Sequence, residues 1–291
     1  MLKRLEVFLI AAIFILITAV ILIIYSTQRE KEFQQNTSAI EQATINGAAY
    51  AINLKLLEKH RHVQLFANEY GRLLVQLNNN PNNEKIENDI KTRLQQRFSD
   101  FFTFTITDSN GRPRLVNIDS LVGHACEMDL SNYAKKISSS KNNYQNTVFI
   151  HPQPFNYHYD IMSPLITGAP NPSVFFVSFY PKEVSDILKT HALPGQQLFL
   201  VKQSDPALIE ISQTGARDKL KREIRLSRNE QRNIHTFKNI PGTDWRLVNV
   251  SDKKYADAYK KGLWKEAIII MVIVTIALFL IMFVLIKGRS K

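Results

Sequence analysis

Two long stretches of the chain contain no charged residue, and they lie near its two ends. They cover residues 7–25 and 267–286, and almost every side chain in them is apolar. An α-helix rises about 1.5 Å per residue, so about twenty residues cross the roughly 30 Å hydrocarbon core of a bilayer. The pattern therefore predicts two transmembrane helices that flank a long segment of mixed polarity.

The first stretch follows Lys3 and Arg4, as the apolar part of a signal peptide follows basic residues. It is longer than the roughly 7–15 apolar residues of a signal peptide, and no A-x-A-like cleavage site comes after it. We therefore expect an uncleaved membrane anchor.

Basic residues next to the spans predict the orientation of the chain. Lys3, Arg4, Lys287, Arg289 and Lys291 lie on the terminal sides, so the positive-inside rule places residues 1–6 and 287–291 in the cytoplasm. Lysines and arginines also lie on the inner sides of both spans, but long loops are translocated largely regardless of charge. We expect a two-pass protein of the inner (cytoplasmic) membrane, with residues 26–262 as one extracytoplasmic domain in the periplasmic space.

The first part of the central segment has the period of a helix. Apolar residues recur at steps of three, four or seven from Ile45 to Leu77, and the helix should end at the polar run 78–83. Residues 84–98 predict a second helix. The apolar stripe should pack on the rest of the domain, or else pair with a second copy in a homodimer.

The remaining pattern predicts short strands with helices inserted between them. Expected helices cover residues 130–138, 181–190, 217–231 and the approach to the second span from 253. Expected strands cover 101–117 with a tight turn at 109–111, then 146–151, the segment from 158, 173–179, 198–201, 207–211, 235–240 and 244–250. This order indicates an α+β domain with a long N-terminal helix and an antiparallel sheet.

Short patterns along this order resemble a known family. They are TITDSNGRPRLVN at 105–117, Leu121-Val122-Gly123 followed by Asp129, Leu130 and Tyr133, the segments 149–165 and 174–179, and GTDWRLVNV at 242–250. Residues 30–260 resemble the Cache (PAS-like) extracytoplasmic sensor domains of bacterial membrane receptors, and most of all the sensor halves of membrane-bound diguanylate cyclases. The resemblance implies a PAS-like sheet with a ligand pocket. Such receptors carry an output domain after the second span, whereas only five residues follow it here.

A cluster of polar and aromatic residues at 151–160 is the best candidate site. In a strand, His158 and Asp160 lie on one face, where they could hold an amine, a carboxylate or, as a less favoured alternative, a metal. In the alternative interpretation, both side chains make only local bonds to the connections around Pro152 and Pro164. The complete set of predicted ligand-binding residues is His158, Asp160, Tyr133, His151, Phe104, Phe176 and Ser178.

Composition narrows the function. The single cysteine, Cys126, excludes an internal disulfide, and a domain of more than 200 residues can be stable without one. The net charge of +11 lies largely beside the spans, and so little chain is expected in the cytoplasm that nucleic-acid binding is not predicted. His124, Cys126 and Glu127 do not have a zinc spacing, so no metal site and no cofactor are expected. No G-x-S-x-G, H-E-x-x-H, P-loop or C-x-x-C motif occurs, and no enzyme is predicted.

Seven basic residues lie between Arg217 and Arg232. They form either a solvated helix face or a patch that meets an anionic partner, lipid or ligand. Taken together, the sequence predicts a membrane signal-sensing module that binds a small extracytoplasmic ligand and acts on a cytoplasmic signalling protein or a missing output domain. The alternative is an envelope structural or interaction protein without a small-molecule ligand.

Overall fold

The structure is a computed structural model that describes residues 2–115, 124–139, 148–151, 157–166, 172–218 and 221–288. The chain divides into two compact units, each of which is described by itself. The first contains Met1–Glu41 and Asp252–Lys291, and the second contains Gln42–Ser251.

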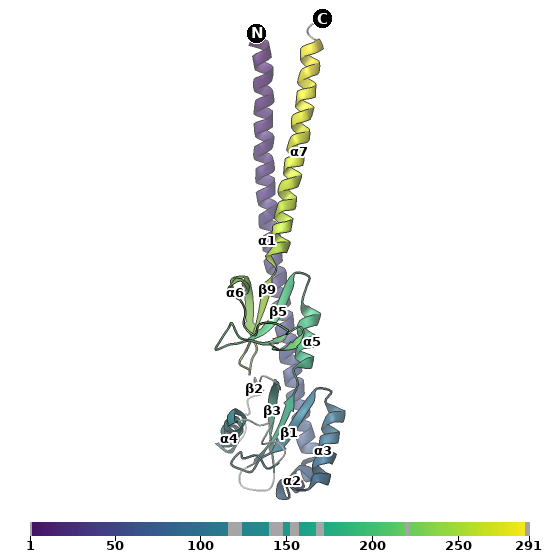
Figure 1. Cartoon of the computed structure of the whole chain (residues 1–291), viewed down its shortest axis with the longest axis vertical. Helices are drawn as coiled ribbons and strands as arrows, with labels where there is room; N and C mark the ends of the chain where they lie inside the picture. The colour runs from purple at the N-terminus through teal and green to yellow at the C-terminus, as the bar shows by residue number, and fades with distance from the viewer. Residues whose placement is uncertain are drawn as a thin grey trace. The chain divides into compact units, whose positions relative to one another are not determined.

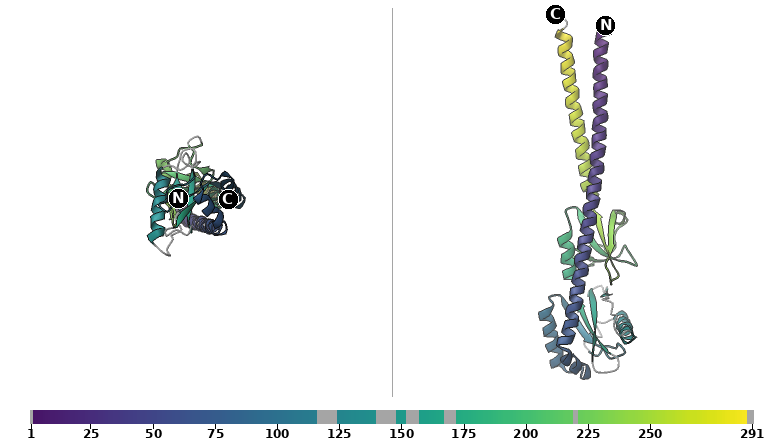
Figure 2. Two further views of the ribbon diagram at one scale, coloured as in Figure 1. Left: turned by 90° about the horizontal axis from the view of Figure 1, so that it is seen from below. Right: turned by 180° about the vertical axis from the view of Figure 1, so that it is seen from behind.

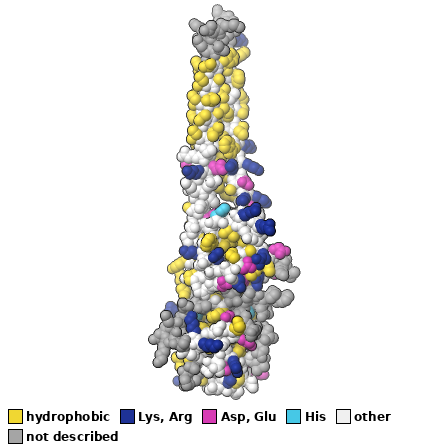
Figure 3. All heavy atoms as spheres, turned by 90° about the vertical axis from the view of Figure 1, so that its left-hand side faces the viewer, with side chains coloured by type: hydrophobic (Ala, Val, Ile, Leu, Met, Phe, Trp, Pro, Cys, Tyr) yellow, Lys and Arg dark blue, Asp and Glu magenta, His cyan; other side chains and the backbone are white. Residues whose placement is uncertain are grey.

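The first unit consists of the start of helix α1 (Leu2–Glu69) and the whole of helix α7 (Lys253–Gly288) (Figure 1). Both helices are long and apolar enough to cross a membrane, as the sequence predicts. Their apolar side chains are largely exposed, with Leu16 at 66% and Val284 at 67%, and cover the visible surface of this part (Figure 3). An apolar surface of this extent is unfavourable in water and suits a lipid environment.

Polar and aromatic contacts join the two helices beyond their apolar stretches. Lys260 donates a hydrogen bond of 2.8 Å to Glu30, and the ring of Phe33 stacks on that of Tyr259 with 3.9 Å between centroids. Basic and aromatic residues of this kind are typical of the interface between hydrocarbon and water.

The second unit begins with helices. The rest of α1 is followed by α2 (Gly71–Asn79) and α3 (Glu84–Arg97), and Asn83 caps α3 by accepting a hydrogen bond from the amide of Ile86. The predicted apolar stripe is buried at Ile45, Ile52, Leu56, Val63, Phe66 and Leu77, and it belongs to the main core of this unit. The prediction that the stripe packs on the domain is therefore confirmed.

Strands β1 (Phe101–Ile106), β2 (Val148–His151), β3 (His158–Leu165) and β4 (Ser173–Phe179) form the first sheet. It is antiparallel with the order β1-β4-β3-β2. Helix α4 (His124–Ser139) lies on one side of this sheet, and α1, α2 and α3 lie on the other (Figures 1 and 2). The predicted turn after β1 is present, and Gly111 has a φ of +82° there.

Helix α5 (Lys182–His191) leads to a second antiparallel sheet with the order β7-β6-β5-β9-β8. Its strands are β5 (Gln196–Lys202), β6 (Ile209–Ser212), β7 (Gly215–Ala216), β8 (Ile234–Asn239) and β9 (Trp245–Ser251). The α+β class, the long N-terminal helix and the two flanking apolar helices are thus confirmed, and the strands are distributed over two sheets.

The predicted helix at 217–231 is wrong for most of its length. Among the described residues of this range only those of α6 (Arg228–Arg232) are helical, and Ser227 and Glu230 form a capping box at its start. Before it, the amide of Ile209 on β6 bonds to the carbonyl of Ile224, and Leu226 bonds to Ala207. Backbone pairing with β6 therefore overrides the helix propensity of the charged residues.

Candidate functional site

The register of the first sheet gives each of its faces a different set of side chains. Asp160 pairs with Ser178, and Met162 pairs with Phe176, so these four share one face with His158. Because Tyr133 of α4 contacts Phe149, the partner of Asp160 on β2, we call this the α4 face. The α1 face carries Tyr159, Ile161, Phe175, Val177 and Phe179, and there Phe175 stacks on Phe66 of α1 at 5.7 Å.

Asp160 lies at the centre of the α4 face and is completely buried. The Ser178 hydroxyl donates a hydrogen bond of 2.6 Å to its Oδ1, and Nε2 of His158 is 3.8 Å from the same oxygen. Phe102 packs on the His158 ring at 5.0 Å between centroids. The structure thus brings together three predicted site residues, His158, Asp160 and Ser178, around one carboxylate.

Helix α4 is held over this face by two contacts. The hydroxyl of Tyr133 donates a hydrogen bond of 3.2 Å to the carbonyl of Met162. At the other contact, the turn after β1 approaches α4 so closely that a Cβ on Gly111 would lie 2.7 Å from the carbonyl oxygen of Leu130. A side chain at Gly111 would therefore displace α4 as well as strain the turn. Tyr133 and Phe176, two further residues of the predicted set, lie on the α4 side.

Phe104 is not brought together with Asp160. The pairing of β1 with β4 shifts between Phe101 and Thr103, so Phe104 pairs with Val177 and faces α1, where its ring contacts Phe175 at 6.4 Å. A β-bulge of this kind moves every later side chain to the opposite face. His151 pairs with His158 in the register of β2 and β3, and its side chain lies outside the described residues, as do the predicted segment 121–123 and Phe155.

A buried ionic cluster lies at the edge of the α1 face, and the sequence did not indicate it. Lys59 of α1, only 4% exposed, contacts the Asp100 carboxylate and lies 2.9 Å from Oε2 of Glu183. Tyr159 donates a hydrogen bond of 3.4 Å to the other oxygen of Asp100. The cluster thus connects α1 to β3 and to the start of α5.

Burial and charge act in opposite directions on the carboxyl groups of this cluster. Burial raises the pKa of Asp100, and the neighbouring Lys59 offsets only part of that effect. Burial also acts to raise the pKa of Glu183, but Lys59, Lys55 and the Ser99 hydroxyl together hold it below its usual value. Lys59 therefore acts to lower the pKa of both carboxyl groups against the effect of burial.

Sequence reasoning also missed a cavity lined by Tyr157 just before β3, by α5 and by the turn between β6 and β7. Its wall comes from four separate segments of the chain, so no local pattern could reveal it. Two of its residues, Arg217 and Lys221, belong to the basic run that the sequence analysis singled out.

The sequence matches no family model and no curated protein. Among solved structures, the ligand-binding domain of the Pseudomonas fluorescens chemoreceptor CtaA with L-isoleucine is similar. It is 12% identical, with 79% of this chain and 98% of that chain covered and a TM-score of 0.49. The corresponding domain of Pseudomonas aeruginosa PctC with GABA is 14% identical, with 70% and 94% covered and a TM-score of 0.45. The sensory domain of Campylobacter jejuni Tlp3 is 11% identical, with 76% and 96% covered and a TM-score of 0.43.

All three similar structures are sensory or ligand-binding domains of chemoreceptors. The predicted likeness to the sensor halves of diguanylate cyclases stays a prediction. At these identities a likeness concerns the arrangement of elements, so the function of this chain rests on its own residues.

Proposed function

We propose that this chain is a transmembrane sensor module of the inner membrane. Its middle part lies outside the cytoplasm and binds a small molecule on the α4 face of the first sheet. The two apolar helices pass the change in shape to a cytoplasmic signalling protein or to an output domain. In this role the chain needs no catalytic residue, metal or cofactor of its own.

The buried Asp160 carboxylate is the observation that carries the proposal. Removing a carboxylate from water is costly unless it is paired and hydrogen-bonded. The fold does not require it, because backbone bonds hold β3 to β4 and apolar residues fill the other face. A few convergent polar groups on an otherwise apolar and aromatic surface are typical of small-molecule sites.

Asp160 favours a ligand with an ammonium group. An ionised carboxylate only accepts hydrogen bonds, and its charge attracts a cation. Phe102, Phe149 and Phe176 provide apolar surface for the rest of such a molecule, and a ring face also attracts a cation. Small primary amines, including amino acids, are therefore the first compounds to test.

A ligand on the α4 face has a short route to α1. Tyr159 follows His158 and precedes Asp160 on β3, but it points to the α1 face and bonds to Asp100, which contacts Lys59. Movement of β3 therefore bears directly on α1, which continues without a break to Leu2. The ligand can shift the helices only by its difference in affinity between their two arrangements.

We also propose that a second copy covers the exposed side of α1. Tyr50, Leu54, Leu57 and Leu65 lie on one side of the helix, away from the buried stripe, and are 41–67% exposed. Two copies anchored in one membrane lie parallel to each other, so this exposed stripe can pair with the same stripe of the second copy. With Cys126→Ser to remove the native thiol, Leu54→Cys should form a disulfide-linked dimer, and His62→Cys, on a different exposed side, should not. Equal cross-linking of both variants would contradict this arrangement.

The function can be tested on the full chain in lipid nanodiscs. A panel of primary amines and amino acids is screened for compounds that raise the unfolding temperature. A ligand at about 100 times its Kd stabilises the folded chain by about 2.7 kcal/mol. Asp160→Asn should abolish the stabilisation, because the amide has the same shape but lacks the charge.

Asp205→Asn is the matched control. Asp205 is a surface carboxylate paired with Arg225, so its loss should leave ligand binding unchanged. The proposal fails if no compound stabilises the chain, or if a folded Asp160→Asn protein binds as tightly as the original. Absence of any ligand would favour the role of an envelope interaction protein.

A further inference from the structure

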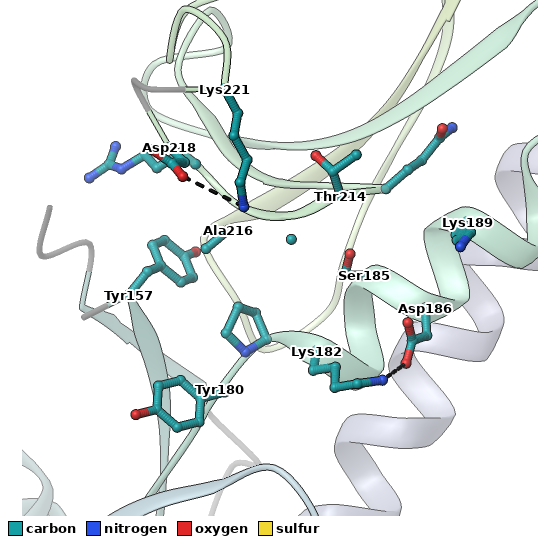
Figure 4. Close-up of a pocket in the computed structure, with 14 residues that line it drawn as sticks. Tyr157, Tyr180, Lys182, Ser185, Asp186, Lys189, Thr214, Ala216, Asp218 and Lys221 are labelled. Atoms are coloured by element: carbon teal, nitrogen blue, oxygen red, sulfur yellow. Dashed lines mark hydrogen bonds and ion pairs between the residues drawn. The ribbon is translucent and has the colours of Figure 1, made fainter. Parts of the chain in front are cut away.

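A cavity of about 680 Å³ lies in the second unit, away from Asp160. Its wall combines Tyr157 and Tyr180 at the ends of two first-sheet strands with α5, the β6–β7 turn and the segment that follows β7 (Figure 4). The volume is within the usual range of about 300–1,000 Å³ for small-molecule sites. A molecule bound here would contact both sheets of the unit at once.

The wall of the cavity is positively charged. Its charged residues are the basic Lys182, Lys189, Arg217 and Lys221 and the acidic Asp186 and Asp218. Each of the acidic residues already has a lysine partner, since Lys182 lies 2.6 Å from Asp186 and Lys221 lies 3.6 Å from Asp218. When the buried Glu210 behind Arg217 is counted as well, the basic side chains at the cavity still outnumber the acidic ones.

Two polar side chains in the wall are held in place from behind. The Arg217 side chain is only 13% exposed, and its Nη1 lies 3.8 Å from the Glu210 carboxylate. Tyr157 is 6% exposed, its hydroxyl oxygen accepts a hydrogen bond of 3.2 Å from the Trp245 indole, and burial together with the neighbouring Glu210 carboxylate raises its pKa. Their positions are set by the core, which limits the conformational entropy lost on binding.

Two polar groups of the wall meet at one place. In Figure 4 the Tyr157 hydroxyl and the Lys221 ammonium both point toward the space beside Ala216. Helix α5 begins at this cavity with Pro181 and Lys182, and no side chain caps its N-terminus. A helix N-terminus adds a partial positive charge, which favours an anion in the same space.

We infer that this cavity binds a small anion with carboxylate or phosphate groups. The guanidinium of Arg217 suits the planar geometry of such groups, and the Lys221 ammonium donates to further oxygens. The site would explain part of the basic run at 217–232, because two of its seven basic residues, Arg217 and Lys221, line the cavity. The inference is independent of the proposed amine site on the α4 face.

The probes are succinate, citrate and inorganic phosphate, each tested on the full chain in nanodiscs of zwitterionic lipid at constant ionic strength. At least one of these anions should raise the unfolding temperature and give a binding isotherm, and comparison among the three distinguishes carboxylates from phosphate. Lys221→Gln should weaken binding about tenfold, since it removes one charged donor. Arg217→Gln should weaken it further, and Arg217→Lys should restore part of the affinity.

Arg225→Gln is the matched control. It makes the same change of charge in the same basic run, but Arg225 forms a bidentate pair with Asp205, at 2.8 and 2.9 Å, and does not line the cavity. Arg217→Gln leaves the buried Glu210 without its cation, so loss of binding in that variant can also result from unfolding. In that case Lys221→Gln provides the test, because the Lys221 side chain is 64% exposed and its replacement does not disturb the core. The inference is overturned if none of the three anions binds, if Arg225→Gln weakens binding as much as Lys221→Gln, or if Asp160→Asn abolishes it.

Discussion

The two faces of the first sheet are equally buried but differ in chemistry. On the α1 face, Phe175 and Phe179 pack against the rings of Phe66 and Phe98, and the ionic cluster around Lys59 lies at the edge. On the α4 face, the Asp160 carboxylate lies at the centre. Burial alone therefore does not distinguish a packing surface from a binding surface. The position of the polar group does, because a charge at the centre of a face costs stability that packing does not require.

The two faces are also mechanically connected. Tyr159 and Asp160 are consecutive on β3 and point to opposite sides, so a shift of the strand moves both. One side would meet the ligand, and the other meets α1 through Asp100 and Lys59. If the comparison is right, substitutions on the α1 face should change stability alone, and substitutions on the α4 face should change ligand binding as well.

Replacing neighbouring phenylalanines on the two faces should give the largest effects. Phe175 and Phe176 are both fully buried, so Phe175→Ala and Phe176→Ala should each cost about 3–5 kcal/mol of unfolding free energy, by loss of apolar contact and the cavity left behind. Only Phe176→Ala should also weaken binding of a compound that needs Asp160. Chemical unfolding measures the first effect, and titration well below the unfolding temperature measures the second.

Phe237→Ala is the control for this pair. Phe237 is 56% exposed on β8, so its removal should change the unfolding free energy by no more than about 0.5 kcal/mol. Equal loss of binding in Phe175→Ala and Phe176→Ala would show that the ligand does not distinguish the faces, and the assignment of the site to the α4 face would then be wrong.

The sequence predicted the elements of this comparison well, because they depend on local periodicity. The alternation at 158–160 correctly separated His158 and Asp160 from Tyr159, and strand 173–179 has its predicted bounds. The side of the sheet on which Phe104 lies could not be predicted from alternation. In a regular pairing from Phe101 and Phe179, Phe104 would lie opposite Phe176, and the bulge at Phe102 moves it one step along.

Long-range contacts account for the other differences. Lys59 and Asp100 are 41 residues apart, and Lys59 is a lysine on a helix that is otherwise rich in solvated charges, so nothing local indicates its burial. The segment before α6 has residues of high helix propensity, but β6 takes its backbone hydrogen bonds. Both features depend on which segments meet in three dimensions.

Lys59→Ala should have a smaller effect than the core phenylalanines, about 3 kcal/mol at neutral pH. Removing one partner of a buried ion pair typically costs about 3–5 kcal/mol, because the other charge stays buried without compensation. The lower end applies here because Asp100, whose pKa burial already raises, can take up a proton instead. Lys182→Ala removes an exposed lysine from the pair with Asp186, and this control should be far less destabilising than Lys59→Ala.

The cost of Lys59→Ala should also depend on pH, with a sign that follows from the two carboxyl groups. In the folded chain Lys59 lowers the pKa of Glu183 and limits the rise in the pKa of Asp100, so the variant raises both values. A raised folded pKa gives stability that is present in acid and lost as the pH rises through it. Relative to the original chain, the variant should therefore be most destabilised at neutral pH and less so near pH 4.

Unfolding measured at both pH values tests this, with Lys59→Met to preserve the packing of the side chain on Phe179, where Nζ lies 4.5 Å from the ring centroid. If Lys59→Met were as stable as the original chain, or if the difference were the same at both pH values, packing rather than charge would explain the role of Lys59, and the link from β3 to α1 would not be electrostatic.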